Sequence, residues 1–147
     1  MVVRSGYIFG RGGTNFLSTF LPRLRRGEPL RVIGDMFGTP TYAEDLAKRL
    51  YELALLDLPG IYHVTNGGEG VSFFEFVRAA ADQSGSTSTA ITAISCSSLN
   101  LLAPRPRNSR LRCLLSEAVG LAPLRDWSEG LADFARPSVG EPAGASS

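Results

Sequence analysis

Lysine, histidine and cysteine are scarce in this chain of 147 residues, and their scarcity excludes several kinds of site. Lys48 is the only lysine, His63 is the only histidine, and Cys96 and Cys113 stand apart without a C-x-x-C spacing. Because a structural zinc takes about four nitrogen or sulfur ligands, usually in paired spacings, we expect no metal site. Two isolated cysteines are typical of reduced thiols, so we predict a cytoplasmic protein.

Long apolar runs and a strong net charge are absent as well. No stretch approaches the roughly 20 apolar residues that span a bilayer, and the N-terminus lacks a charged leader followed by an apolar segment. We therefore expect neither a membrane span nor a signal peptide. The formal net charge of +1 gives no overall attraction to nucleic acid or to an anionic membrane. We predict no nucleic-acid partner.

Arginine carries nearly all of the positive charge, and it gathers in two clusters. One cluster covers residues 4–31, and the other covers residues 105–112, which hold no acidic residue. Planar guanidinium groups suit phosphate oxygens, so both clusters are compatible with a phosphorylated ligand. For any single arginine, a role as a solvated surface residue is at least as good an explanation as phosphate binding.

Strand-like and helix-like patterns alternate along the chain, which indicates an α/β fold. Strand patterns occupy residues 2–4, 30–33, 61–64 and 90–94. Helices are predicted to begin near Asn15, Thr41, Ser72 and Asp126. Residues 34–40 and 95–112 look irregular. From Pro137 onward, the small and polar composition predicts a disordered tail.

Local signals define these helices further. Asn15 suits an N-cap and Gly27 a C-terminal cap, while Pro22 should kink the helix between them or end its regular hydrogen bonding. Thr41–Glu44 and Ser72–Glu75 both match the capping box, in which two side chains reciprocally satisfy open backbone donors. Apolar spacing predicts the buried helix faces: Phe16, Phe20, Leu21 and Leu24; Ala43, Leu46, Ala47, Leu50 and Leu53; Phe73, Phe76, Val77 and Ala80; and Trp127, Leu131 and Phe134.

Gly67, Gly68 and Gly70 lie between a predicted strand and a predicted helix, where a turn can cradle a phosphate. A dinucleotide-binding turn needs a third glycine three residues further on. Phe73 occupies that position and would block close packing of helix and strand. We therefore interpret this segment as a plain loop and predict no cofactor site in it.

Catalytic patterns are missing from the sequence. There is no G-x-S-x-G nucleophile elbow. A Tyr-x-x-x-Lys pair, in which lysine lowers the pKa of a tyrosine that protonates a sugar carbonyl, is excluded because Glu44 stands four residues before Lys48. His63 shares a strand face with Ile61, which favours a structural histidine over a general base. We predict no catalytic residue in this chain.

Short segments spread along the chain resemble, in order, the motifs of one enzyme family. Residues 3–10 (VRSGYIFG) are similar to R-T-S-W-V-Y-G, and Asn15 with Phe16 is similar to the start of the next helix. Residues 31–47 are similar to V-x-D-Q-x-G-x-P-T-x-x-x-D-L-A.

The later segments continue the series. Residues 60–63 (GIYH) and 72–76 (SFFEF) are similar to G-I-Y-H and S-W-Y-E-F. Residues 105–109 (RPRNS) resemble R-P-x-N-S, and Asp126 with Trp127 resembles the D-W that opens the last helix. Each segment alone is weak evidence, but together and in order they resemble the dTDP-4-dehydrorhamnose reductases.

The resemblance implies an α/β fold that is the carboxy-terminal portion of an NAD(P)-binding, Rossmann-type extended short-chain dehydrogenase. Such a portion has an incomplete parallel sheet and a small substrate-binding subdomain. In that family the amino-terminal half binds NADPH and carries the tyrosine and lysine. Hydride goes to the C4 carbonyl of dTDP-4-dehydro-L-rhamnose, which gives dTDP-L-rhamnose, and the site lies between the halves.

Three substrate-binding residues are carried over by the resemblance. Tyr7 matches a family tryptophan that lines the sugar pocket, and Asn15 and Arg105 match polar contacts to the sugar nucleotide. Met36 stands where the family has glutamine and Phe9 where it has tyrosine. These differences bear on the identity of the sugar more than on the fold.

We therefore expect residues 1–136 to be the sugar-nucleotide-binding portion of a reductase and residues 137–147 to be a disordered tail. This portion would bind no cofactor by itself and be inactive without an amino-terminal reductase half as its partner. The alternative is a non-catalytic binding or regulatory module of the same fold, like the regulatory subunit of methionine adenosyltransferase. An open strand edge and uncovered apolar surface would make the isolated chain form homo-oligomers or aggregate.

Overall fold

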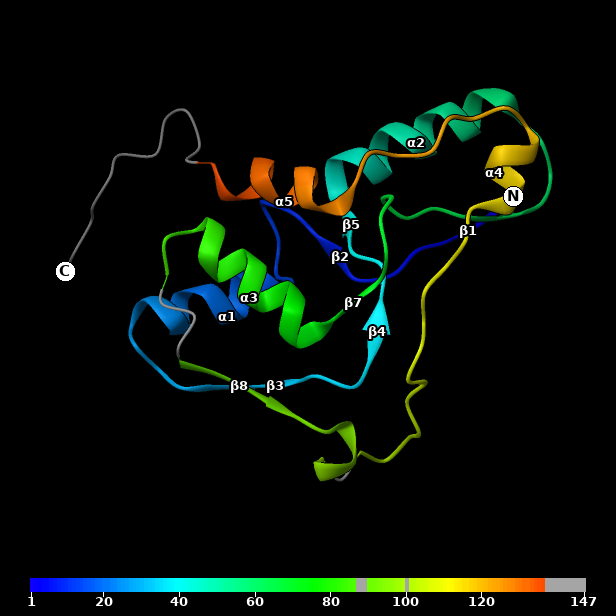
Figure 1. The fold of residues 1–147 in the computed structure, drawn as a ribbon. Coiled ribbons are helices and arrows are strands. Elements are labelled where there is room, and N and C mark those ends of the chain that lie inside the picture. Colours follow the sequence, from blue (N-terminus) through cyan, green and yellow to red (C-terminus); the bar gives the residue numbers. More distant parts are fainter. Residues whose placement is uncertain (87–89, 100, 137–147) are drawn as a thin grey trace.

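Strands and helices alternate through the computed structural model, which describes residues 1–86, 90–99 and 101–136 (Figure 1). The strands are β1 (Val2–Arg4), β2 (Ile8–Phe9), β3 (Leu30–Ile33), β4 (Phe37–Gly38), β5 (Thr41–Tyr42), β6 (Ile61–His63), β7 (Val71–Ser72) and β8 (Ile91–Ile94). The helices are α1 (Phe16–Arg25), α2 (Ala43–Leu56), α3 (Phe73–Gln83), α4 (Leu114–Ala118) and α5 (Trp127–Ala135), with the 3-10 helix η2 (Cys96–Ser98). The predicted α/β character is confirmed, whereas the predicted tail at 137–147 lies outside the described residues.

The strands in the described ranges pair two by two instead of forming one continuous sheet. β1 pairs with β6, β2 with β5 and β3 with β8, all in parallel, while β4 and β7 are antiparallel. Within residues 1–86, 90–99 and 101–136, β1 therefore has β6 as its one strand neighbour, and its other edge carries no strand. This arrangement agrees with the incomplete parallel sheet that we predicted.

A larger core lies where α1 and α3 pack together over the β3–β8 pair and α5 packs against α3 (Figure 1). Aromatic rings meet near its centre: the centroid of the Phe76 ring is 5.1 Å from that of Phe9 and 5.8 Å from that of Trp127. The buried members of this larger core are Phe9, Leu17, Leu21, Leu24, Leu30, Val32, Tyr42, Phe76, Val77, Ala80, Ala81, Ile91 and Leu131. Full burial of one large apolar side chain contributes about 1.5–3 kcal/mol, so this cluster dominates the stability.

A smaller core lies at the other end of the molecule, where β1 and β6 run beside α2 and α4 (Figure 1). Its buried members are Leu53, Tyr62 and Val64. The opposite side of the strand pair is open to solvent, because Val2 is 54% exposed and Ile61 is 51% exposed. This small cluster is therefore covered on one side only.

Most local signals in the sequence are confirmed. Asn15 caps α1 together with Ser18. Pro22 does not end the helix, which was one of the two effects predicted for it, because α1 continues to Arg25. Gly27 ends the segment with φ +73°, and its amide donates to the carbonyl of Leu24 at 2.9 Å. The capping box at the start of α3 has both of its reciprocal bonds, and Asp126 caps α5. β3 has the predicted bounds.

The predicted capping box at Thr41–Glu44 is wrong. α2 begins after Tyr42, which makes no side-chain cap bond. The Thr41 hydroxyl instead donates to the carbonyl of Gly6 at 2.8 Å, and the Tyr42 hydroxyl donates to the Glu44 carboxylate at 2.9 Å. Pairing of β5 with β2 brings Thr41 close to Gly6, in the connection between β1 and β2. The Thr41 hydroxyl therefore bonds to a residue far away in the sequence instead of capping α2.

The buried face of α2 also differs from the prediction. Leu53 is buried as expected, but Asp45 and Arg49 are buried with it, while Ala47 and Leu50 are exposed. The helix therefore turns a partly polar stripe inward. Two regions predicted as irregular hold short elements, since β4 falls within 34–40 and η2 within 95–112. No helix in the described part of the chain has both the length and the apolar character needed to cross a membrane.

Candidate functional site

Tyr7 lies in the connection between β1 and β2 and is held in an unusual backbone conformation. Its φ is +46°, in the left-handed region that residues with a side chain rarely adopt. The ring stacks on Phe73 at the start of α3, with centroids 4.0 Å apart and planes inclined by 22°. A side-chain carbon added at Gly38 would lie 2.5 Å from the Tyr7 ring, so only glycine fits there. The surrounding structure therefore fixes the orientation of this ring.

The Tyr7 hydroxyl is neutral in the folded protein at ordinary pH. Burial raises the pKa of Tyr7 to about 12, against a smaller opposite effect of a hydrogen bond with Ser109. The hydroxyl also lies 3.4 Å from the carbonyl oxygen of Met36, to which it donates. Such a group suits hydrogen bonding to a neutral ligand better than proton transfer.

The segment 107–109, within the predicted R-P-x-N-S signature, is joined to the Tyr7 region through Phe37 of β4. The Phe37 amide donates to the carbonyl of Arg107 at 2.8 Å, and the Ser109 amide donates to the carbonyl of Phe37 at 2.8 Å. The Ser109 hydroxyl donates to the same carbonyl at 3.1 Å. These bonds fix an extended, exposed segment beside the aromatic stack.

The three residues carried over from the resemblance have different surroundings. Arg105 is exposed on the extended segment, which leaves its guanidinium accessible to a ligand. Asn15 is occupied in capping: its side-chain oxygen accepts from the amides of Leu17 and Ser18, and its nitrogen donates to the carbonyl of Gly10 at 2.6 Å. Asn15 is connected to Tyr7 indirectly, through the aromatic ring of the residue that follows it. Phe16 is 4.9 Å from Phe73, which in turn stacks on Tyr7.

Sequence reasoning missed two residues of this site. Phe73 was assigned to the buried face of α3, yet it is only partly buried and forms the platform under Tyr7. Phe37 was placed in an irregular loop, although it carries the bonds that hold 107–109. The capping box of α3 marks Phe73 as the first helical residue, and that is the one local signal that pointed toward it.

The glycine loop at 66–70 is a close-packed loop, as we interpreted it. A side-chain carbon at Gly67 would lie 2.8 Å from the carbonyl oxygen of Leu124, and one at Gly68 would collide with the carboxylate of Asp126. At Gly70 the obstacle would be the side chain of Arg110. A side chain at any of these three positions would therefore collide with protein atoms, which explains why glycine occupies them. The Asp126 carboxylate would also repel an anion.

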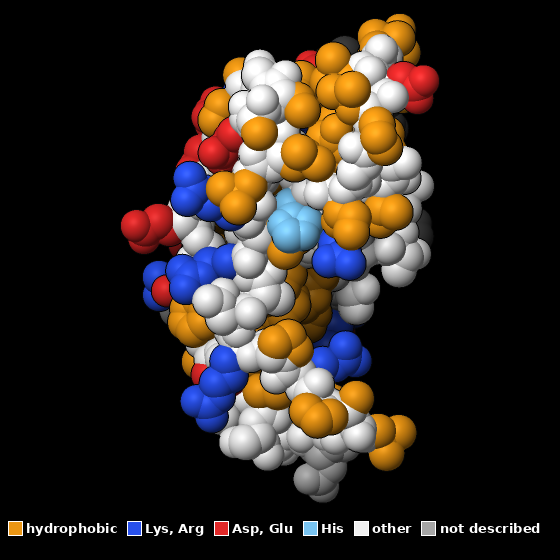
Figure 2. All heavy atoms as spheres, turned by 90° about the vertical axis from the view of Figure 1, so that its right-hand side faces the viewer, with side chains coloured by type: hydrophobic (Ala, Val, Ile, Leu, Met, Phe, Trp, Pro, Cys, Tyr) orange, Lys and Arg blue, Asp and Glu red, His pale blue; other side chains and the backbone are white. Residues whose placement is uncertain are grey.

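One face of the molecule combines a hollow with cationic side chains. Figure 2 shows His63 near the middle of this face, a recess with hydrophobic side chains below it, and lysine or arginine side chains on both flanks. His63 Nδ1 lies 3.2 Å from the carbonyl oxygen of Arg112, which agrees with a structural histidine. In the described residues, no group of three or more histidine, cysteine, aspartate or glutamate side chains could hold a metal ion.

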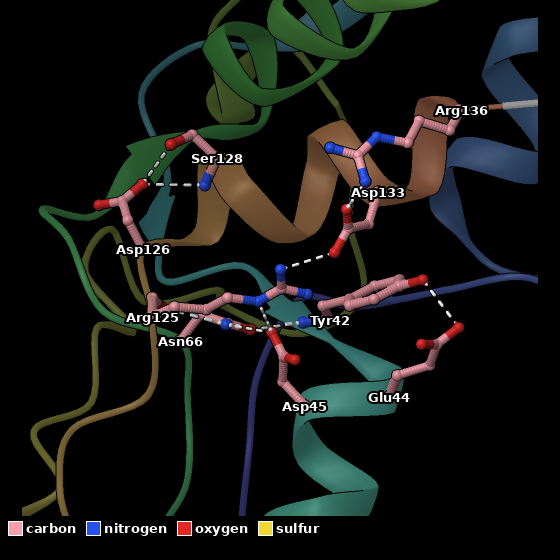
Figure 3. A network of polar contacts seen from close by, with 9 residues as sticks. All are labelled: Tyr42, Glu44, Asp45, Asn66, Arg125, Asp126, Ser128, Asp133 and Arg136. Carbon is pink, nitrogen blue, oxygen red and sulfur yellow. Dashed lines mark hydrogen bonds and ion pairs between the residues drawn. The ribbon is translucent and has the colours of Figure 1, made fainter.

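A network of polar groups joins α2, the loop after β6 and α5 (Figure 3). The buried Asp45 carboxylate accepts from Arg125 Nε at 2.8 Å and from Asn66 Nδ2 at 2.8 Å. Arg125 also donates to Asp133 at 2.6 Å, and its guanidinium lies 5.7 Å from the ring centroid of Tyr42. The hydrogen bond from Arg125 holds the pKa of the Asp133 carboxyl below its usual value. All these charges are paired, so the network supports the fold.

The site therefore offers an aromatic platform, a neutral phenol and exposed guanidinium groups. Rings of this kind stack on a base or a sugar, and guanidinium groups bind phosphate.

Comparisons with known proteins agree with this description. Residues 1–139 match the family model described as the RmlD substrate binding domain. The chain is 37% identical over 133 residues to the spore coat polysaccharide biosynthesis protein SpsK of Bacillus subtilis, covering 90% of this chain and 46% of that protein. It is 34% identical over 142 residues to a dTDP-4-dehydrorhamnose reductase of Mycolicibacterium smegmatis, covering 95% and 43%.

A solved structure shows the same fold. A dTDP-4-dehydrorhamnose reductase of Bacillus anthracis, determined in complex with NADP, superposes with a TM-score of 0.84 at 30% identity. The match covers 90% of this chain and 46% of that one. The fold is thus that of a Rossmann-type extended short-chain dehydrogenase, and the chain spans less than half the length of the relatives it matches.

Proposed function

Because this chain belongs to the family of the RmlD substrate binding domain, we propose that residues 1–136 bind the sugar nucleotide of a dTDP-4-dehydrorhamnose reductase. The single observation that carries the proposal is the Tyr7–Phe73 stack beside the arginine-rich segment 105–110. A cytoplasmic location is part of the proposal, and the two free cysteines support it.

The parts of this site have separable roles. The Tyr7 ring forms the wall against which the sugar or base lies, and its fixed orientation reduces the ordering cost of binding. Arg105, which is exposed, supplies charge for the diphosphate. Asn15 acts indirectly, because its side chain is engaged in capping α1, whose first residue Phe16 contacts Phe73.

The reaction of the proposed enzyme is reduction of the C4 carbonyl of dTDP-4-dehydro-L-rhamnose by NADPH, which gives dTDP-L-rhamnose. A carbonyl reduction needs a hydride donor and an acid that protonates the alkoxide. The glycine loop of this chain departs from the dinucleotide-binding pattern, because Phe73 stands where the third glycine would be. The contribution of this chain is therefore binding and orientation of the sugar nucleotide. Hydride and proton come from an amino-terminal reductase half.

Binding of dTDP by the full chain tests the site. We expect Tyr7→Ala to weaken binding by about tenfold or more, because stacking on one ring contributes about 1–3 kcal/mol per base, and Arg105→Ala to weaken it about fivefold. Tyr7→Phe keeps the ring and should bind nearly as well as the natural chain. Arg31→Ala is the matched control, since Arg31 is an exposed arginine on β3. Titration calorimetry gives the affinities, and Trp127 fluorescence checks that each variant is folded.

Unchanged affinity in both Tyr7→Ala and Arg105→Ala would contradict the proposed site. Absence of any dTDP binding, together with tight association with an unrelated enzyme, would favour the alternative of a regulatory module.

The exposed surface of α2 supports the proposal that an amino-terminal reductase half is the partner of this chain. Tyr51 and Leu55 of α2 and Leu58 just after its end, here together called the α2 apolar face, are 68%, 70% and 43% exposed. Leu58 also lines a shallow pocket together with Met1, the residue before β1. Figure 2 shows hydrophobic side chains gathered in the upper part of the face, at the end where the N-terminus and α4 lie. Contiguous exposed apolar surface of this kind marks an interaction site.

Co-expression with the amino-terminal half of the SpsK protein of Bacillus subtilis tests the partner. We expect the two chains to copurify and to reduce dTDP-4-dehydro-L-rhamnose with NADPH. Leu55→Glu should abolish copurification, because it places a charge in the apolar contact. Leu102→Glu is the matched control, since Leu102 is fully exposed outside the α2 apolar face. Equal copurification of both variants would refute this contact surface.

A further inference from the structure

The side chain of Arg110 lies at the start of β7, beside the Tyr7–Phe73 stack. A side-chain carbon added at Gly70, the residue before β7, would collide with Cγ and Cδ of Arg110 and would lie 2.8 Å from the carbonyl oxygen of Gly38. A carbon added at Gly38 would in turn lie 2.5 Å from the Tyr7 ring. The arginine stem and the phenol ring therefore pack against two glycines that lie next to each other.

Asn108 holds this arginine in place. Its side-chain oxygen accepts from Arg110 Nε at 2.9 Å and from the Arg110 amide at 3.2 Å, and Asn108 itself is aligned with Phe37 of β4 by a parallel bridge. Among the described residues, no protein group accepts from the terminal nitrogens Nη1 and Nη2 of Arg110, and the residue is exposed. The stem is thus fixed while the two terminal donors remain available, which reduces the ordering cost of binding a ligand.

The charge of Arg110 is not neutralised by a carboxylate. Arg112 lies 3.6 Å from the carboxylate of Glu117, whereas Arg110 and Arg105 form no ion pair in the described part of the chain. Of these last two arginines, Arg110 is the one whose side chain is fixed by a hydrogen bond. A planar guanidinium with free charge and two free terminal nitrogens can donate two parallel hydrogen bonds to a phosphate.

We infer, on the basis of the proposed sugar-nucleotide site, that Arg110 binds the phosphate joined to the sugar and that Asn108 positions its guanidinium for this contact. Because Tyr7 lines the proposed sugar pocket, a guanidinium beside it meets the phosphate joined to the sugar before it meets the phosphate joined to the nucleoside. Arg105, five residues earlier on the extended segment, remains available to the second phosphate.

Titration calorimetry of the full chain with dTDP and with thymidine monophosphate tests this contact, because the monophosphate lacks the phosphate assigned to Arg110. We expect Arg110→Ala to weaken dTDP binding about tenfold and monophosphate binding less than about twofold, since a hydrogen bond to a charged group is removed for dTDP alone. Arg112→Ala, which removes the same charge two residues along, is the matched control and should change neither affinity by more than about twofold.

Asn108→Ala and Asn108→Asp test the positioning role. The alanine variant frees the Arg110 side chain and should weaken dTDP binding about threefold, with the monophosphate affinity unchanged. The aspartate variant keeps the acceptor but places a negative charge against the guanidinium, so it should weaken dTDP binding at least as much as Arg110→Ala. Equal losses for dTDP and the monophosphate in Asn108→Ala would show a merely structural role and overturn this part of the inference.

The same titrations separate a failure of this contact from a failure of the proposed function. If Tyr7→Ala weakens dTDP binding while Arg110→Ala binds both nucleotides like the natural chain, the sugar-nucleotide site stands and the role of Arg110 is refuted. Equal losses of dTDP and monophosphate affinity in Arg110→Ala would overturn the assignment to the phosphate joined to the sugar. A folded natural chain that binds neither nucleotide would overturn the proposed function and this contact together.

Discussion

The larger core and the smaller core differ in how completely the chain covers them. The larger core is surrounded by α1, α3, α5 and the β3–β8 pair, and residues such as Phe76, Val77 and Leu131 are at most 1% exposed. The smaller core has α2 and α4 on one side of the β1–β6 pair, and the other side is exposed at Val2 and Ile61. One region is thus closed by its own helices, and the other presents a free apolar surface.

The difference explains where each function can reside. The proposed sugar-nucleotide site rests on the closed region, because Phe73 opens α3 and Phe16 opens α1. The proposed contact with a reductase half rests on the open one, at Leu55 and its neighbours. A binding site gains from a rigid support, whereas a docking surface needs exposed apolar area.

The largest effect is expected from a cavity in the larger core. Phe76→Ala removes the ring that touches Phe9 and Trp127, and it should lower the free energy of unfolding by about 4 kcal/mol. Leu55→Ala, on the α2 apolar face, should change it by less than about 0.5 kcal/mol in the monomeric chain. Urea unfolding followed by Trp127 fluorescence measures both. Similar losses in the two variants would remove the distinction between a closed and an open region.

A smaller effect is expected at the network that joins the two regions. Asp45→Asn keeps the shape of the side chain but removes the charge that Arg125 and Asn66 satisfy, and it should cost about 2 kcal/mol. Arg125 keeps its bond to Asp133 and is partly exposed, which limits the loss. Asp82→Asn, at an exposed position on α3, is the control. Hydrogen exchange should show that the β1–β6 amides lose more protection than those of β3–β8.

The same network shows why part of the fold could not be predicted from the sequence. β3 and the caps of α1, α3 and α5 follow from residues close together in the chain, and they were predicted correctly. The buried face of α2 was predicted wrongly, because Asp45 is buried by a partner 80 residues away. An apolar pattern cannot reveal such a pair, since burial of a charge depends on the partner that neutralises it.

The candidate site also combines features that the sequence indicates with features that depend on residues far apart in the chain. Tyr7 was placed by resemblance, but its left-handed backbone, its contact with Gly38 and the bond from the Thr41 amide to its carbonyl involve residues about 30 positions away. β4 has two residues, too few for a periodic pattern, and it is held by Ser72 of β7 and by residues 107–109. Long-range hydrogen bonds set this part of the site, and no local sequence signal encodes them.

The smallest effect is expected at Tyr7, which lies in the connection between β1 of the open region and β2 of the closed one. Its pKa of about 12 in the folded chain exceeds the ordinary 10.0, mainly because of burial. Folding therefore favours the neutral phenol. Its contribution to the free energy of unfolding is complete below pH 10 and is lost as the pH rises towards 12. Tyr7→Phe keeps the stack on Phe73 and loses the long bond to Met36 and the hydrogen bond with Ser109, so at neutral pH it should cost about 0.5–1 kcal/mol. The difference in phenolate absorbance between the natural chain and Tyr7→Phe isolates this one tyrosine, and its midpoint should lie well above 10.0. A midpoint at the ordinary value would mean that the ring is open to water, and the rigid platform proposed for the sugar nucleotide would then be lost.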